Sequence, residues 1–150
     1  MRGRNEKRRR MAADYMARYD DYKRYIEARR EAVTGAGAIR YDAVSGNGRT
    51  SPVEISVETL ERISTDFRAQ IVETINAAWA IYMTILEYSK MESFSINERE
   101  IVKSALWMNM TKPLANRYED FNMDTMPVGR ATFYNYRRGF LNFLADRIGL

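Results

Sequence analysis

The sequence has no cysteine and no histidine among its 150 residues. The absence of cysteine excludes disulfides and thiolate chemistry. The absence of histidine excludes Ser-His-Asp hydrolysis, Cys-His nucleophiles and histidine general bases, and together the two absences exclude Cys/His zinc sites. Only carboxylate-held metals or the chemistry of Lys, Tyr and Arg remain. We therefore expect a protein that is not an enzyme and that needs no cofactor.

The alternative to a protein without a cofactor is a hard metal ion held by clustered carboxylates. They fall in two places: Asp14, Asp20 and Asp21, and then Glu119, Asp120 and Asp124. Such ions prefer oxygen ligands. Because both clusters are interleaved with cations or lie in a polar segment, we interpret them as solvated charge and expect no metal site.

Long apolar runs are also missing. The longest candidate, AAWAIYMTIL, covers ten residues, about half of what a bilayer-spanning helix needs. The N-terminal MRGRNEKRRRM is followed by a polar, tyrosine-rich stretch rather than by an apolar segment, so it does not resemble a secretory signal. These features predict a soluble protein, and the bacterial or host cytoplasm is the compartment that we expect.

Positive charge is concentrated at both ends of the chain. The formal net charge is +4, yet residues 1–10 hold six Lys or Arg against one Glu. Residues 126–150 hold four Arg against the single acid Asp146. An uneven distribution of this kind favours a polyanionic partner such as nucleic acid. The alternative is that the N-terminal residues form only a solubilising tail.

Helical periodicity and its interruptions divide the chain into four parts. Residues 1–34 combine a basic arm with a helix from residue 11, and residues 35–55 form a glycine-rich linker or loop. Residues 56–91 predict one long helix for packing or self-association, and residues 92–150 predict a DNA-binding domain. The N-terminal helix carries a tyrosine stripe, interpreted as packing, with a base-stacking surface as the alternative. No alternating strand pattern is present, so we expect an all-α fold with long helices.

The last part predicts three helices that end in a helix-turn-helix unit. Ser95 and Glu98 form a capping-box pattern at the start of the first of these helices. Pro113 suits the first turn of a second helix over residues 112–121, with Leu114, Ala115 and Tyr118 facing inward. The third helix runs from Gly129 or Arg130 to Gly149. In a unit of this kind the second helix braces the third across the groove of DNA.

The third helix has two chemically different faces. The positions that share the apolar face are Phe133, Tyr136, Arg137, Phe140, Leu141, Leu144, Ala145 and Ile148. The opposite face presents Arg130, Ala131, Tyr134, Asn135 and Arg138. Because Arg bonds guanine, Asn bonds adenine and Ala contacts the thymine methyl group, we expect Arg130, Ala131 and Asn135 to read bases. The residues expected to hold phosphates are Thr132, Tyr134, Arg137, Arg138, Lys112 and Arg117. The alternative is a terminal helix that docks on the core and leaves a solvated basic face.

The segment ATFYNYRRGFLNFLADRIGL resembles the end of the RinA and ArpU-type regulators of phage late-gene transcription. Its matching positions are Thr132, Phe133, Tyr134, Arg137, Arg138, Leu144, Ala145, Ile148, Gly149 and Leu150. SGNGRTSPVE and NEREIVKSALW resemble further stretches of that family, so the similarity covers about residues 44–150. The family pattern differs at Gly129, where it usually has Ser, and at EDFNMDTM, which lengthens the connection before the last helix. The resemblance implies a helix-turn-helix similar to sigma factor region four.

These observations predict a sequence-specific DNA-binding transcriptional regulator of phage or prophage origin. Its expected partners are double-stranded DNA, RNA polymerase and further copies of the same chain. Two alternatives stay open. One is a small terminase subunit that recognises packaging DNA, which a large closed ring in solution would favour. The other is a helical scaffold that binds a protein through Trp79 and Tyr82.

Overall fold

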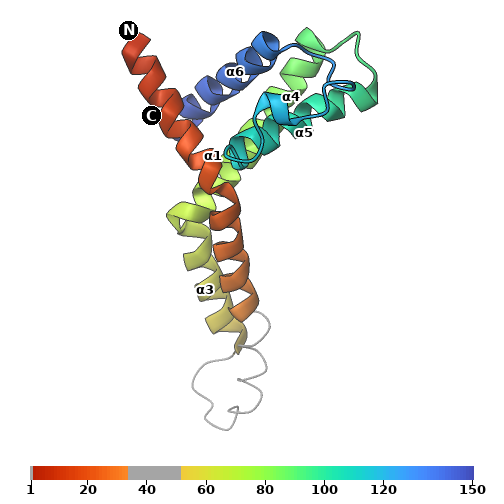
Figure 1. Cartoon of the computed structure of the whole chain (residues 1–150). Coiled ribbons are helices and arrows are strands. Elements are labelled where there is room, and N and C mark those ends of the chain that lie inside the picture. The colour runs from red at the N-terminus through yellow and green to blue at the C-terminus, as the bar shows by residue number, and fades with distance from the viewer. Residues whose placement is uncertain (1, 34–51) are drawn as a thin grey trace. The chain divides into compact units, whose positions relative to one another are not determined.

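The computed structural model describes the backbone of residues 2–33 and 52–150 and the side chains of residues 3–33 and 59–150. Within those ranges the chain is all-α, with five α-helices, one short 3₁₀ helix and no strand. The α-helices are α1 (Arg2–Glu31), α3 (Pro52–Thr65), α4 (Phe67–Lys90), α5 (Ile96–Thr111) and α6 (Arg130–Ile148), and the 3₁₀ helix η3 covers Tyr118–Asp120 (Figure 1). The expected all-α class is confirmed. Most of the expected glycine-rich linker at residues 35–55 lies outside the described residues, and no described helix has the length and apolar character needed to cross a bilayer.

The chain divides into two compact units that are not contiguous in sequence. One unit comprises residues 1–19 and 74–150, and the other comprises residues 20–73. The second unit is small. One cluster of its buried residues consists of Ile26, Ile63 and Ala69, with Val33 and Leu60 packed against them.

Aromatic rings form much of the core of the first unit. Trp79 of α4 packs edge-on against Trp107 of α5 and against Phe140 of α6, with centroid distances of 5.0 and 5.2 Å. Tyr19 of α1 packs on Trp107 at 4.8 Å, and its hydroxyl donates to Asn76 Oδ1 at 2.6 Å. Edge-to-face pairs of this kind add to the free energy gained by burying the rings. For Tyr19, packing rather than base stacking is therefore the role that the structure supports.

Helix α1 begins earlier than the sequence indicated. We expected a basic arm followed by a helix from residue 11, whereas α1 already starts at Arg2. Six cations near a helix N-terminus oppose the helix dipole, so local sequence disfavours this extension. Contacts with the C-terminal helix compensate, because Arg8 Nε donates to the Leu150 carbonyl at 2.7 Å and the Arg8 guanidinium pairs with Asp146. The expected arm is thus part of a packed helix.

The expected long helix over residues 56–91 is divided in two at Asp66. The Asp66 amide bonds the Ile63 carbonyl at 3.1 Å, which closes a tight turn at the end of α3. Asp66 Oδ1 accepts from the Arg68 amide at 2.8 Å. Aspartate favours such capping positions because its short side chain satisfies an amide that lacks a helical partner. The single-helix prediction was therefore wrong at this residue.

The expected second helix of the helix-turn-helix, residues 112–121, is absent. After α5 the chain makes a turn, and only η3 is helical. Lys112, which precedes Pro113, has φ −137° and ψ 64°, outside the helical region, as expected for a residue before proline. Leu114 is fully exposed and Ala115 is also exposed, so these two residues give a helix no apolar face to bury, whereas Tyr118 faces inward as predicted and packs on Phe133 at 5.4 Å. The prediction of an α-helix over residues 112–121 was wrong, and only the short η3 lies beside α6 in this segment.

Candidate nucleic-acid interface

Helix α6 is defined by glycine at both ends. Gly129 is the N-cap and has no side chain with which to bond the first amides of the helix. Gly149 is the C-cap at φ 89°, a left-handed conformation that glycine adopts without strain. The predicted bounds of this helix, Gly129 or Arg130 to Gly149, are confirmed.

The two faces of α6 are separated as the sequence predicted. Phe133, Phe140, Leu141, Leu144 and Ala145 are buried, whereas Tyr136, Arg137 and Ile148 are half-buried at the border. On the opposite face Arg130, Ala131, Asn135 and Arg138 are exposed, and Thr132 and Tyr134 are half-buried. The side chains expected to read bases therefore point to solvent and not into the protein interior.

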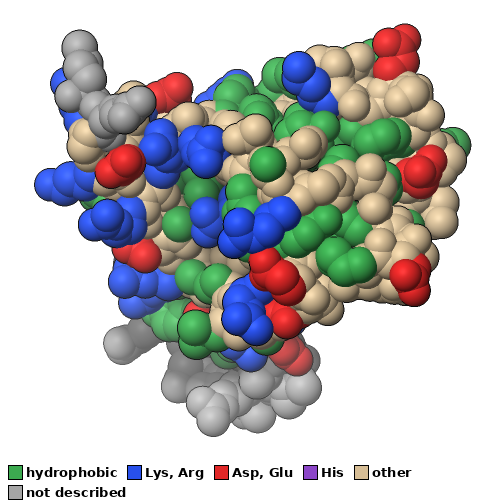
Figure 2. Space-filling view, turned by 45° about the horizontal axis from the view of Figure 1, so that its top comes forward, with side chains coloured by type: hydrophobic (Ala, Val, Ile, Leu, Met, Phe, Trp, Pro, Cys, Tyr) green, Lys and Arg blue, Asp and Glu red, His purple; other side chains and the backbone are tan. Residues whose placement is uncertain are grey.

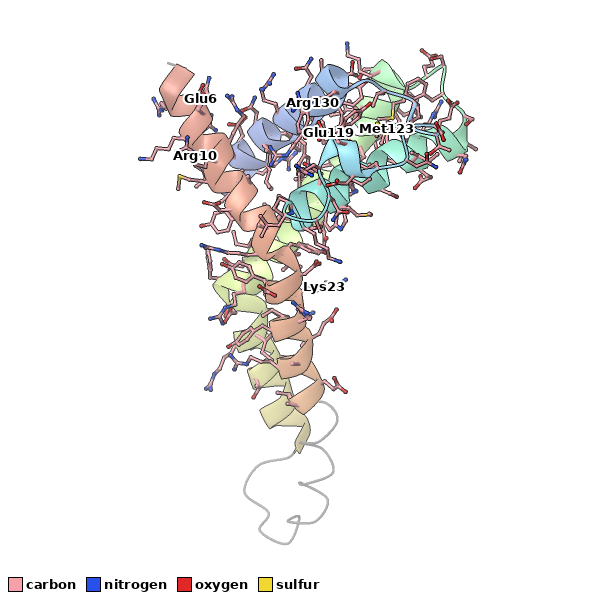
Figure 3. The ribbon with its side chains drawn as sticks, in the orientation of Figure 1. Glu6, Arg10, Lys23, Glu119, Met123 and Arg130 are labelled. Carbon is pink, nitrogen blue, oxygen red and sulfur yellow. The ribbon has the colours of Figure 1, made fainter. Side chains whose placement is uncertain are left out.

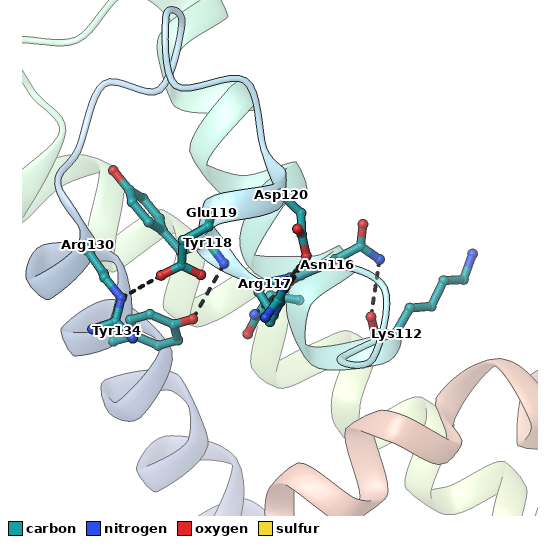
Figure 4. A network of polar contacts seen from close by, with 9 residues as sticks. Lys112, Asn116, Arg117, Tyr118, Glu119, Asp120, Arg130 and Tyr134 are labelled. Carbon is teal, nitrogen blue, oxygen red and sulfur yellow. Dashed lines mark hydrogen bonds and ion pairs between the residues drawn. The ribbon is translucent and has the colours of Figure 1, made fainter.

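Arg130 is exposed but bonded within the protein. Its Nε donates to Glu119 Oε1 at 2.7 Å, and its guanidinium lies over the ring of Tyr134, 5.1 Å from the centroid (Figures 3 and 4). A hydrogen bond from the backbone of Glu119, followed by the bond from Arg130, lowers the pKa of the Glu119 carboxyl. The Glu119 carboxylate thus binds the Arg130 guanidinium, which belongs to the first residue of α6.

Asn135 and Arg138 form a pair one turn along α6. Arg138 Nη1 donates to Asn135 Oδ1 at 2.9 Å. This leaves the Asn135 amide N–H groups and other guanidinium N–H groups of Arg138 as donors. The Asn135 amide and the Arg138 guanidinium are thus hydrogen-bond donors that lie next to each other on the exposed face of α6.

Arg137 is set apart from these residues by its burial. Its Nε donates to Asn109 Oδ1 at 2.8 Å, and Asn109 Nδ2 donates to the Asn116 carbonyl at 2.8 Å. Burial lowers the pKa of the Arg137 guanidinium. This arginine therefore links α6 to α5 and to the turn that follows α5, a structural role that the sequence did not indicate.

Lys112 and Arg117, both expected to hold phosphates, are exposed on the turn after α5 rather than on a helix. Arg117 Nε lies 3.4 Å from Asp120 Oδ2, and the Lys112 carbonyl accepts from Asn116 Nδ2 at 3.1 Å (Figure 4). Nearby, the Tyr134 hydroxyl accepts from the Tyr118 amide at 3.4 Å, which links α6 to η3. The segment is ordered by these local bonds although it is not the expected helix.

The first unit also contains a basic groove, which the sequence did not locate. It lies between the N-terminal part of α1 and helix α6 and encloses about 330 Å³. Its charged and aromatic lining residues are Glu6, Arg9, Arg10, Tyr134, Arg137 and Arg138. Figure 2 shows most of the visible Lys and Arg side chains on the side of the view where the N-terminal part of α1 lies, with some acidic side chains among them, whereas the charged side chains on the opposite edge are acidic. The sequence showed positive charge at both ends of the chain. The packing of α1 on α6 brings these charges together in one groove.

The sequence also suggested a carboxylate metal site and a protein-binding stripe. In the ranges that the structure describes, no three carboxylates come close enough together to hold a metal ion. The Trp79 and Tyr82 rings, considered above as a protein-binding stripe, pack against Phe140 of α6, with Tyr82 at 5.8 Å, and Trp79 also lines an open groove of about 710 Å³ between α4 and α5. The exposed face of α6 and the basic groove beside it make up the candidate nucleic-acid interface.

Comparisons of the chain with protein-family models, with curated proteins and with solved structures found no match.

Proposed function

We propose that this protein is a sequence-specific DNA-binding transcriptional regulator that inserts α6 into the major groove. The observation that carries the proposal is the exposure of Arg130, Ala131, Asn135 and Arg138 on one face of a helix whose other face is buried. An α-helix fits the major groove of B-DNA, and these residue types match the hydrogen-bonding and methyl groups of base edges there.

Positive charge supports a nucleic acid as the partner. The cations of residues 1–10 belong to α1, whose N-terminal part packs on α6 through Arg8 and Arg9, since Arg9 Nη1 lies 3.3 Å from Asn142 Oδ1. The first amides of α6 have no side-chain cap, and free amides of this kind favour a phosphate nearby. The groups that we propose to read bases and those that we propose to bind phosphates therefore belong to one compact unit.

A role in transcription rests on the resemblance of residues 44–150 to phage late-gene regulators and not on the geometry. Partners that follow from this part of the proposal are RNA polymerase and further copies of the chain. A solution mass measurement tests the second of these.

Selection of bound duplexes from a random pool tests the proposal. We expect the full-length protein to enrich a defined sequence motif and to bind that motif at least about a thousandfold more tightly than mixed-sequence DNA at physiological salt. Salt dependence of the selected duplex then gives the number of phosphates contacted. Enrichment of no motif, or no binding to any duplex at low salt, would refute sequence-specific recognition.

A further inference from the structure

The groove between α1 and α6 contains more positive charge than its own residues neutralise. Four of its lining residues are arginines, Arg9, Arg10, Arg137 and Arg138, whereas Glu6 is its single carboxylate. Among the described residues, none of these four arginines forms an ion pair, and the partners of Arg9, Arg137 and Arg138 are the neutral amides of Asn142, Asn109 and Asn135. By contrast, Arg8 is paired with Asp146 outside the groove.

Uncompensated guanidiniums in a partly desolvated groove repel one another, because charges interact more strongly where water is reduced. An anion in the groove relieves this repulsion. The planar guanidinium bonds phosphate or carboxylate oxygens through two parallel N–H groups, which a halide cannot match, and a phosphodiester strand, unlike a single carboxylate, offers a separate anion to each of several guanidiniums. Tyr134 also lines the groove, and its hydroxyl, which accepts from the Tyr118 amide, keeps its own hydrogen for a backbone oxygen.

The groove is continuous with the exposed face of α6. Tyr134 and Arg138 belong to both, since they line the groove and lie within one turn of Asn135. A strand whose phosphates follow the groove therefore passes directly beside the side chains assigned to base reading. A flat anionic bilayer would touch the rim of such a groove, whereas a phosphodiester strand can lie along it.

From this geometry we propose that α1 is the bracing helix of the interface. Arg9 and Arg10 hold the phosphate backbone of one DNA strand against Arg137 and Arg138, while the N-terminal half of α6 faces the bases. In this arrangement α1 performs the role that the sequence assigned to residues 112–121. The inference rests on the proposed function for its ligand, and it adds a site that is formed by residues more than 100 positions apart.

Salt-dependent binding of the full chain to a labelled mixed-sequence duplex tests the site, with Arg10→Gln as the main variant. Among the described residues Arg10 has no ion pair or hydrogen bond, so the substitution should leave folding intact. We expect weaker binding and a decrease of about 0.9 in the steepness of log K against log salt, the change for one lost phosphate contact. Glu6→Gln should act in the opposite direction and tighten binding.

Arg18→Gln is the matched control, because Arg18 is an exposed cation of α1 that does not line the groove. If Arg10→Gln and Arg18→Gln reduce the salt slope equally while the unchanged protein binds DNA, the groove assignment is wrong and the proposed function stands. If the unchanged protein binds no duplex, both fail. Binding to phosphatidylserine vesicles that duplex DNA does not displace would assign the groove to lipid and overturn the inference.

Cross-linking gives a second measurement, which reports the position of the bound duplex rather than the strength of binding. Because the chain has no cysteine, Glu6→Cys provides a single attachment point for a photoreactive group in the groove. We expect it to cross-link to the duplex, whereas Ser104→Cys, which lines a separate groove between α4 and α5, should not. Equal cross-linking from both positions would contradict the proposed path of the strand.

Discussion

Arg137 and Asn109 are joined across the contact between α6 and α5 by a hydrogen bond of 2.8 Å from Nε to Oδ1. Asn109 is buried, and through its Nδ2 it also binds the carbonyl of Asn116 in the following turn. One amide side chain thus accepts from the Nε of a half-buried guanidinium and donates to the turn that follows α5. This link, together with the buried apolar face of α6, connects the helix to α5.

Replacement of Asn109 with alanine should therefore destabilise the fold. We expect Asn109→Ala to lower the free energy of unfolding by about 2 to 3 kcal/mol, since it removes two hydrogen bonds and leaves a partly buried charge without its acceptor. Urea denaturation followed by circular dichroism measures the change. Asn97→Ala, at an exposed position near the start of α5, is the control and should change stability by less than about 0.5 kcal/mol. Similar losses for the two variants would show that the Arg137–Asn109 link contributes little.

Gly139 provides space for Tyr82 in the contact between α6 and α4. A Cβ at position 139 would overlap the Tyr82 hydroxyl and lie 3.2 Å from Cζ of that ring. Although alanine is the better helix former by about 1 kcal/mol, we expect Gly139→Ala to destabilise the protein by about 1 to 3 kcal/mol through this overlap.

Tyr82→Phe tests the cause of that loss, because it removes the overlapping oxygen. In the double variant we expect Gly139→Ala to cost at least about 1 kcal/mol less than it costs alone, which a double-mutant cycle of thermal or urea unfolding would measure. Additive effects of the two substitutions would show that the hydroxyl is not the obstacle.

Arg130 is the residue whose loss should change specificity most clearly. We expect Arg130→Ala to weaken binding to the selected duplex about tenfold to a hundredfold and to relax the preference at one base pair. Binding to mixed-sequence duplex should change much less. An equal loss on both duplexes, measured by fluorescence anisotropy, would assign Arg130 to the phosphate backbone instead.

Glu119 competes with DNA for the same guanidinium, because its carboxylate lies 2.7 Å from Arg130 Nε. We expect Glu119→Gln to tighten duplex binding by up to about fivefold, the range expected for release of an exposed ion pair. Asp124→Asn removes the same charge from the same loop and has no described contact with Arg130, so it should tighten binding less. Weaker binding by Glu119→Gln would mean that Glu119 orders Arg130 for recognition rather than withholding it.

The sequence predicted α6 well because the information that shapes this helix is local. Gly129 and Gly149 mark its ends, and the spacing of Phe133, Phe140 and Leu144 defines its buried face. The capping box at Ser95 is likewise confirmed, with Glu98 N donating to Ser95 Oγ at 3.1 Å and Ser95 N donating to Glu98 Oε1 at 2.9 Å. Patterns of this kind depend on residues within one or two helical turns.

The segment at residues 112–121 shows where local patterns misled us. Proline is favoured in the first turn of a helix, and the apolar Leu114 and Ala115 suggested an inward face. Proline also forces the preceding residue out of the helical region, and an exposed Leu114 gains nothing from helix formation. Local propensity allows both outcomes, and the turn forms where Leu114 and Ala115 have no surface to pack against.

The sequence by itself determined that this protein is helical, that its cations gather near both ends, and that α6 has one apolar and one polar face. These properties follow from composition and from a period of 3.6 residues, which act over short distances along the chain. Only the tertiary structure decided that α1 extends to Arg2 and lies against α6, that Arg137 turns to Asn109, and that four arginines line one groove. The reason is separation: Arg8 and Leu150 are 142 positions apart, and no local pattern encodes which distant partner a side chain will meet.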